Sequence, residues 1–159
     1  MLIKFFLVVI ILVGLDQLTK YAAFHYLQIL DTIPIIQDIF HLTYVQNRGA
    51  AFGILQDQRW FFVIITCIIL LGIIYYYIKL PKSQLYRWVR FSLILISAGA
   101  IGNLIDRLRL GFVIDFFDFR LINFPVFNVA DVCVVIGTIL LSLIIFIITW
   151  LALGGYWLI

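Results

Sequence analysis

Long apolar segments constrain the fold of this chain more than any other feature of its sequence. A helix that spans a membrane needs about 20 mostly apolar residues. Four such segments occur, at about 4–26, 60–79, 88–107 and 130–152, and no charged residue follows Asp131. The core of such a chain must be built by helices that pack together in lipid. The sequence therefore predicts an all-α polytopic membrane protein with four transmembrane helices, in a single domain of residues 1–159.

Composition excludes several classes of protein. Hydrophobic residues make up 65% and charged residues 12% of the chain, whereas soluble domains are about 25% charged. The net charge of +3 comes from dispersed basic residues, which argues against a nucleic-acid partner. All eight acidic residues are Asp, so a zinc site of the HExxH type is impossible. Cys67 and Cys133 lie in apolar runs, and we interpret them as small buried residues rather than metal ligands or disulfide partners. We expect neither a metal nor a cofactor.

Basic residues near the ends of the segments indicate their orientation. The connection after the second segment contains no acid and four basic residues, Lys79, Lys82, Arg87 and Arg90. This charge places the connection in the cytoplasm. With four spans both termini are then cytoplasmic as well, and Lys4 agrees with this orientation.

The other two connections, at about 27–59 and 108–129, then lie outside the cytoplasm. In the first of them, residues 35–52 alternate partly between apolar and polar side chains, and NRGAAFG supplies glycines for a turn. Short strands joined by such a turn are the interpretation we favour. We therefore expect a small β-containing extracytoplasmic platform in the first outer loop.

Polar residues gather near one face of the predicted bilayer. The third segment meets Asn103, Asp106 and Arg107 only at its outer end, and the fourth begins with Asn128 and Asp131. Asp16 lies past the midplane of the first segment, toward the same side, by the helical rise of about 1.5 Å per residue. A carboxylate at the edge of hydrocarbon is costly, so such a group marks a candidate functional site.

Several of these residues also have a structural interpretation. Asp16 and Lys20 are spaced for an intrahelical ion pair, and Asn128 is placed to cap the fourth helix, with Asp131 as its acidic partner. Two further structural interpretations are ion pairs, one at a helix end between Asp106 and Arg107 and one on the surface between Asp118 and Arg120. Ala98 and Gly102 have the spacing of a helix-packing face.

Asp115 resists such an explanation, because the acid in GFVIDFFDF caps nothing obvious. We expect Phe116 and Phe117 to raise its pKa by desolvation. Two carboxylates held close in a poorly solvated place share one proton. Such a pair can hydrolyse a bond without a covalent intermediate, because one group takes a proton from water while the other donates to the carbonyl oxygen.

Other chemistries remain to be weighed. A Ser/His site would require His25 or His41 to fold back onto a serine in or beside an apolar helix. A transporter could use membrane carboxylates as a proton relay, although the acids cluster on one side and no inverted repeat is visible. A metal-dependent lipid or phosphate enzyme with Asp ligands is a third possibility, and a purely structural membrane protein is a fourth.

Five motifs resemble those of lipoprotein signal peptidase (signal peptidase II), an intramembrane aspartic protease. They are DQLTK at 16–20, QNRGAAFG at 46–53, GNLIDR at 102–107, VIDF at 113–116 and FNVAD at 127–131. Their order is that of the family, and the resemblance covers essentially the whole chain. Any single motif is weak, but five in order are highly specific.

The resemblance implies an activity, a site and a location. Members of that family cleave the signal peptide of a bacterial prolipoprotein on the amino side of a cysteine that carries diacylglycerol. Carried over to this chain, the resemblance makes Asp115 and Asp131 the catalytic pair. The positions that would shape or support the site are Asp16, Asn47, Asn103, Arg107, Asn128 and Ala130. We accordingly expect a monomeric multi-pass enzyme of the bacterial inner membrane, with its active site near the extracytoplasmic face and a lipid-modified substrate.

Overall fold

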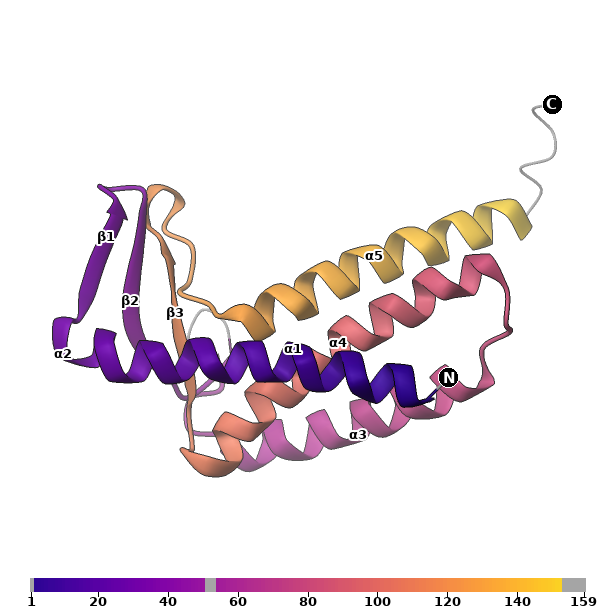
Figure 1. The fold of residues 1–159 in the computed structure, drawn as a ribbon, viewed down its shortest axis with the longest axis horizontal. Coiled ribbons are helices and arrows are strands. Elements are labelled where there is room, and N and C mark those ends of the chain that lie inside the picture. Colours follow the sequence, from indigo (N-terminus) through magenta and orange to yellow (C-terminus); the bar gives the residue numbers. More distant parts are fainter. Residues whose placement is uncertain (1, 51–53, 153–159) are drawn as a thin grey trace.

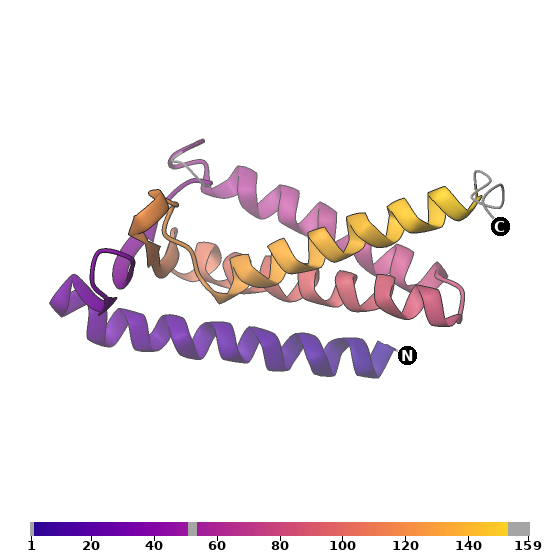
Figure 2. The ribbon, with the colours of Figure 1, turned by 90° about the horizontal axis from the view of Figure 1, so that it is seen from above.

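The computed structural model describes residues 2–50 and 54–152. Four long helices run beside one another, and a three-stranded sheet stands across one end of them (Figures 1 and 2). The first helix begins, and the last helix ends, at the end of the bundle opposite the sheet (Figure 1). The molecule therefore has one end that carries the sheet and one end that carries the α3–α4 connection.

Each predicted spanning segment lies within an observed helix. Helix α1 (Leu2–Ala22) continues through a π-helical turn, η1 (Ala23–Leu27), into α2 (Gln28–Leu30). The other long helices are α3 (Arg59–Lys79), α4 (Gln84–Arg109) and α5 (Val129–Ala152). All four are long and apolar enough to cross a membrane. The chain is a multi-pass membrane protein.

Helix α4 is the centre of the bundle. It packs against α1, α3 and α5, and 56% of its most apolar segment is buried, against 17% in each of the other spans. Small residues allow this close packing: Ala98 is fully enclosed, and a Cβ atom on Gly99 would come within 2.7 Å of Val134 Cγ2. The stretch predicted as a packing face therefore packs as expected.

The sheet combines strands from the two connections at this end of the bundle, residues 27–59 and 108–129. Strands β1 (Thr32–Ile36) and β2 (Phe40–Asn47) confirm the prediction of strands in the first long connection, but the turn between them lies at residues 37–39 and not in the glycine-containing NRGAAFG stretch. Strand β3 (Val113–Phe119) adds antiparallel to β2 in the order β1-β2-β3. The third strand comes from the second long connection, where no strand was predicted. Nearly every residue of β3 is buried on both faces, and such a strand gives an apolar run rather than an alternating pattern. Residues 51–53 of the expected glycine turn lie outside the described part.

Helix η1 fixes the sheet to the bundle. Its buried residues Ala23 and Leu27 pack with Ile114 and Phe116 of β3 in one apolar cluster. Because the same helix continues from the membrane span, the position of β3 is set by α1. The strand therefore cannot shift relative to the helices without exposing this cluster.

One cysteine differs from the expectation. Cys133 is buried, as predicted, but Cys67 is exposed on α3. Since α3 borders the bundle on only one side and is mostly exposed, an apolar residue of this helix can face lipid as easily as protein. Burial of Cys67 was therefore wrongly inferred from the apolarity of its neighbours.

Candidate active site

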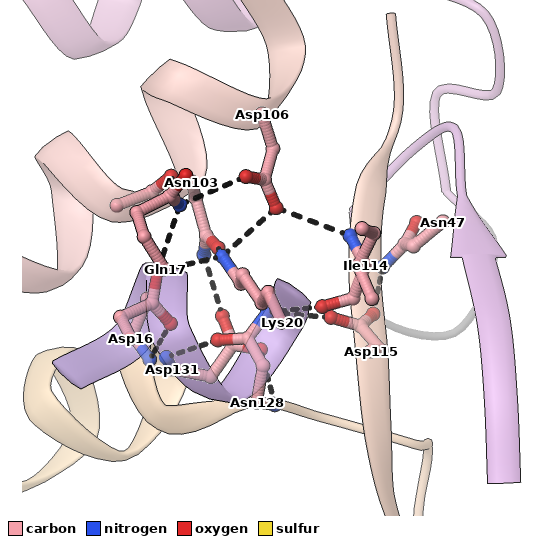
Figure 3. A network of polar contacts seen from close by, with 12 residues as sticks. Asp16, Gln17, Lys20, Asn47, Asn103, Asp106, Ile114, Asp115, Asn128 and Asp131 are labelled. Atoms are coloured by element: carbon pink, nitrogen blue, oxygen red, sulfur yellow. Dashed lines mark hydrogen bonds and ion pairs between the residues drawn. The ribbon is translucent and has the colours of Figure 1, made fainter. Parts of the chain in front are cut away.

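Asp115 projects from the middle of β3 into a pocket of amide groups. Its side chain is 1% exposed. The Asn47 side chain donates to Oδ2 at 2.9 Å, and the Asn128 side chain donates to Oδ1 at 2.6 Å. Asn47 reaches it because β2 pairs with β3, in a register that places Val45 opposite Asp115. Figure 3 shows the Asn47 side chain beside Asp115. The carboxyl group is thus held at both oxygens by residues far apart in sequence.

Asp131 lies in the first turn of α5 and takes part in a reciprocal cap. The Asp131 backbone N–H donates to Asn128 Oδ1 at 2.9 Å, and the Asn128 backbone N–H donates to Asp131 Oδ2 at 3.1 Å. The other carboxylate oxygen accepts from Asn103 Nδ2 at 2.8 Å. The predicted capping pair is present. Because Asn128 also donates to Asp115, the cap joins the two carboxyl groups.

Burial dominates the electrostatics of Asp115. Desolvation raises the pKa of this carboxyl group to about 7, the charge of Asp131 adds to the rise, and the donors Asn47 and Asn128 and the charge of Lys20 oppose it. The direction agrees with the expectation for an acid among phenylalanines. Asp115 therefore titrates near neutral pH, so either protonation state is readily reached there.

A buried ammonium group lies behind the pair. Lys20 is 2% exposed, and its Nζ atom contacts Asp16 Oδ2 at 3.0 Å, Asp106 Oδ2 at 3.0 Å and Asn103 Oδ1 at 2.8 Å. Figure 3 shows these groups converging from α1 and α4. One cation thus neutralises two buried carboxylates and orients the amide that donates to Asp131.

The two carboxylates beside Lys20 each hold a backbone group of the site. Asp16 Oδ1 accepts from the backbone N–H of Ala130 at 2.9 Å, and Asp106 Oδ2 accepts from that of Ile114 at 3.2 Å. Ala130 precedes Asp131 and Ile114 precedes Asp115 in the chain. The intrahelical pair of Asp16 and Lys20 is therefore present and also supports the site.

The proposed helix-end pair of Asp106 and Arg107 is wrong. Adjacent helical residues point in different directions and do not face each other. Asp106 turns inward to Lys20 and Gln17. Arg107 instead donates to the carbonyl oxygen of Gly49 at 3.1 Å and lies over the ring of Phe62 at 4.7 Å. Arg107 thus attaches the segment after β2 to α4.

The expected pair of Asp118 and Arg120 is present at 2.9 Å. Only the arginine is on the surface, however, because Asp118 is 9% exposed and accepts from Thr43 at 2.7 Å. Burial raises the pKa of Asp118, but the hydrogen bonds and the charge of Arg120 outweigh it and hold the pKa below its usual value. This pair stabilises the sheet and stands apart from the cluster around Asp115.

A cavity of about 490 Å³ contains both carboxyl groups. Its polar wall consists of Asn47, Asn103, Arg107, Asp115 and Asp131. Its other wall includes Val135 and Ile136 of α5, whose side chains are 55% and 51% exposed. The cavity therefore runs from a polar cluster to the lipid-facing surface of the bundle.

Three members of this cluster were not among the predicted site residues: Gln17, Lys20, which was considered only with Asp16 as an ion pair, and Asp106, which was placed in the polar cluster but interpreted as a partner of Arg107. Each contacts at least one other polar group of the site. The signal that could have found the two charged residues is their position within apolar segments, where an unpaired charge is costly. Gln17 carries no such signal. Among residues 2–50 and 54–152, no three His, Cys or Asp side chains gather in a geometry that suits a metal ion.

The comparisons with known proteins agree on one family. The family model described as "Signal peptidase (SPase) II" matches residues 8–147. A lipoprotein signal peptidase of Clostridioides difficile (strain 630) is 50% identical over 139 residues, which cover 87% of this chain and 92% of the relative. A lipoprotein signal peptidase of Brevibacillus brevis (strain 47 / JCM 6285 / NBRC 100599) is 46% identical over 142 residues, which cover 89% and 94%.

A solved structure has the same fold. It is a bacterial membrane enzyme determined by the in meso method at 2.3 Å resolution, and it matches with a TM-score of 0.81 at 38% sequence identity. The match covers 92% of this chain and 88% of the other. The arrangement of helices and sheet is therefore shared with an enzyme.

Proposed function

The chain belongs to the signal peptidase II family, and from this we propose that it is an intramembrane aspartic endopeptidase. Its substrates are bacterial prolipoproteins, from which it removes the signal peptide by cleaving on the amino side of the diacylglyceryl-modified cysteine. Proteases of this family process lipoprotein precursors, as the matched relatives are named. The observation that carries the aspartic mechanism is that Asp115 and Asp131 line one cavity that reaches the lipid-facing surface.

The reaction follows from the protonation of the pair. Asp115 holds the shared proton, since its pKa of about 7 makes the neutral form accessible. Asp131, as the base, takes a proton from water, whose oxygen then attacks the scissile carbonyl carbon. Asp115 gives its proton to the carbonyl oxygen, which yields a neutral tetrahedral diol. The amide nitrogen then takes a proton from Asp131, the diol returns one to Asp115, and the C–N bond breaks.

The supporting residues hold the carboxyl groups of Asp115 and Asp131 in position. Asn128 contacts both carboxyl groups, and Asn103 joins Asp131 to Lys20. Asp16 acts through the Ala130 backbone. Arg107 and Asn47 connect the segment after β2 to the cavity. These residues position the reacting groups, and the asparagines can also pair with backbone groups of an unwound substrate, which are costly to leave unpaired in lipid.

The location of the cavity suits a substrate that stays in the membrane. Its polar wall is at the sheet end of the bundle, and its apolar wall faces lipid. A signal helix and the diacylglyceryl group can therefore arrive laterally, while water reaches the carboxyl groups from the sheet side. We assign the enzyme to the bacterial inner membrane as a monomer, with the sheet on the extracytoplasmic side and both termini in the cytoplasm. It uses no metal, cofactor or nucleic acid.

One assay tests the function. Purified protein in detergent is mixed with a diacylglyceryl-modified prolipoprotein and with the same precursor lacking lipid. Cleavage of the lipidated form alone, unchanged by EDTA, is the expected result. Asp115→Asn and Asp131→Asn should each abolish turnover without unfolding the protein, and Asp57→Asn, an exposed aspartate paired only loosely with Arg48, serves as the control. Turnover by either site variant contradicts the catalytic pair.

A further inference from the structure

A second cavity lies away from the active site, between α3, α4 and α5. Its volume is about 560 Å³, and none of its lining residues lines the cavity that contains Asp115 and Asp131. The wall is almost wholly apolar and includes Gly72, Tyr76, Leu80, Tyr86, Leu141 and Ile145. These residues lie toward the end of the bundle that carries the α3–α4 connection (Figure 1). We call it the distal cavity.

The distal cavity is open to the bilayer. Tyr76 and Ile145 on its wall are 65% and 52% exposed, so no other part of the described chain covers it. Apolar cavities of this kind exclude water, and a volume of several hundred Å³ is typical of sites that hold a small ligand. At this depth in a membrane, the available apolar ligand is a lipid acyl chain.

The rim of the distal cavity, at the α3–α4 connection, has basic residues next to wall residues in the sequence. Lys79 adjoins Leu80, Lys82 follows it, and Arg87 adjoins Tyr86; all three basic side chains are exposed. No acidic residue occurs between Asp57 and Asp106. Basic groups at such a position between transmembrane helices attract anionic lipid headgroups. The same charge disfavours the other apolar segment at hand, the signal peptide of the substrate, because signal peptides begin with a positively charged region.

The rim is held in a fixed shape by a buried arginine. Arg90 is 8% exposed, and its Nη2 atom donates to the carbonyl oxygens of Leu80 at 3.0 Å and Pro81 at 2.6 Å. These bonds attach the α3–α4 connection to α4. The wall at Leu80 is thereby preorganised, which reduces the cost of binding a ligand.

We propose that the distal cavity binds one acyl chain of an anionic phospholipid, with the phosphate against Lys79, Lys82 and Arg87. The site is separate from the proposed peptidase chemistry, and its occupancy can be measured without any turnover. Its ligand class is a diacyl phospholipid with a net negative headgroup, for which phosphatidylglycerol is the probe.

Two glycines give a matched test of the apolar part. A Cβ atom on Gly72 or on Gly14 would meet nothing within 4 Å, but only Gly72 lines the distal cavity. Gly72→Leu therefore fills the cavity, and Gly14→Leu adds the same side chain to α1. Phospholipid bound to the purified proteins is measured by native mass spectrometry in detergent with added phosphatidylglycerol or phosphatidylcholine. Wild type and Gly14→Leu should bind phosphatidylglycerol, and Gly72→Leu should lose most of it.

The charge is tested independently by the triple variant Lys79→Gln, Lys82→Gln, Arg87→Gln, which changes only exposed side chains. Its preference for phosphatidylglycerol over phosphatidylcholine should fall about tenfold or more, given the usual contribution of a basic residue near a lipid surface. Equal binding of the two lipids by wild type, or unchanged binding by Gly72→Leu, overturns the proposal. A higher KM for lipidated precursor in Gly72→Leu, with lipid binding intact, assigns the cavity to the signal helix instead and equally overturns it.

Discussion

At the scale of single residues, Lys20 is the charge on which the buried acids depend. Removing one partner of a buried ion pair typically costs about 3–5 kcal/mol, because the remaining charge is left without compensation. Lys20→Met leaves both Asp16 and Asp106 in this state. We expect the unfolding temperature to fall sharply in a thermal melt in detergent, together with kcat.

Lys4→Met is the matched control, since it makes the same change at an exposed position of the same helix. It should leave both quantities near wild type. If Lys20→Met had the same unfolding temperature and kcat as the control, the ion pairs of Lys20 would neither stabilise the fold nor position the catalytic pair.

The pH dependence belongs to the same scale. The proposed reaction needs one proton on the pair, so activity should fall as the pH rises through about 7, the pKa of Asp115. Asn47 donates to this carboxyl group and so favours its charged form. Asn47→Ala should raise the pKa and move the upper limb of the kcat profile to higher pH by about one unit, given a charged hydrogen bond of about 1.5–3 kcal/mol.

Gln46→Ala is the neighbouring control, because Gln46 is exposed and its side chain forms a hydrogen bond only with Tyr44 among the described residues. Its pH profile should match wild type. A shift of the Asn47→Ala limb toward lower pH would contradict the assignment of the limb to Asp115.

At the scale of elements, the contact between α4 and α5 sets the distance between Asn103 and Asp131. A Cβ atom on Gly99 would meet Val134 Cγ2 at 2.7 Å and the Ala130 carbonyl oxygen even closer. Gly99→Ala must therefore push the first turn of α5 outward. We expect a large loss of kcat and a lower unfolding temperature.

Gly14→Ala, in the open part of α1, is the corresponding control. Alanine favours a helix over glycine by up to about 1 kcal/mol, so this variant should melt no lower than wild type and keep full activity. Equal activity of the two variants would show that the helix contact tolerates movement and does not hold the pair in place.

At the scale of the whole molecule, the two ends of the bundle allow the proposed orientation in the membrane to be tested. The sheet and the α3–α4 connection lie at opposite ends of the bundle. In a background of Cys67→Ala and Cys133→Ala, Gln37→Cys and Ser83→Cys place single thiols at exposed positions near these two ends. An impermeant maleimide should label Gln37→Cys on the extracytoplasmic side of intact membranes and Ser83→Cys only after permeabilisation. The reverse pattern would invert the proposed topology.

The sequence predicted the membrane spans and most of the polar cluster because both depend on local signals. Twenty apolar residues reveal a span, and an aspartate in apolar surroundings reveals a costly group. Asp115 and Asp131 were found in this way, Asn128 was found as a capping residue, and the cap that joins Asn128 to Asp131 was visible from their spacing. Strand β3 and the exposure of Cys67 were missed, because a doubly buried strand and a lipid-facing helix both appear simply apolar.

The sequence by itself therefore determined the four long helices and pointed to Asp115 and Asp131. The helices follow because a bilayer requires long apolar segments, and the two acids stand out because burying a carboxylate is costly. The tertiary structure decided which groups meet. Asp106 forms an ion pair with Lys20 of α1 and not with its neighbour Arg107. Asn47 reaches Asp115 only because β2 and β3 pair. Such contacts join residues up to 114 positions apart, and no local pattern encodes them, because each depends on how separate helices and strands pack.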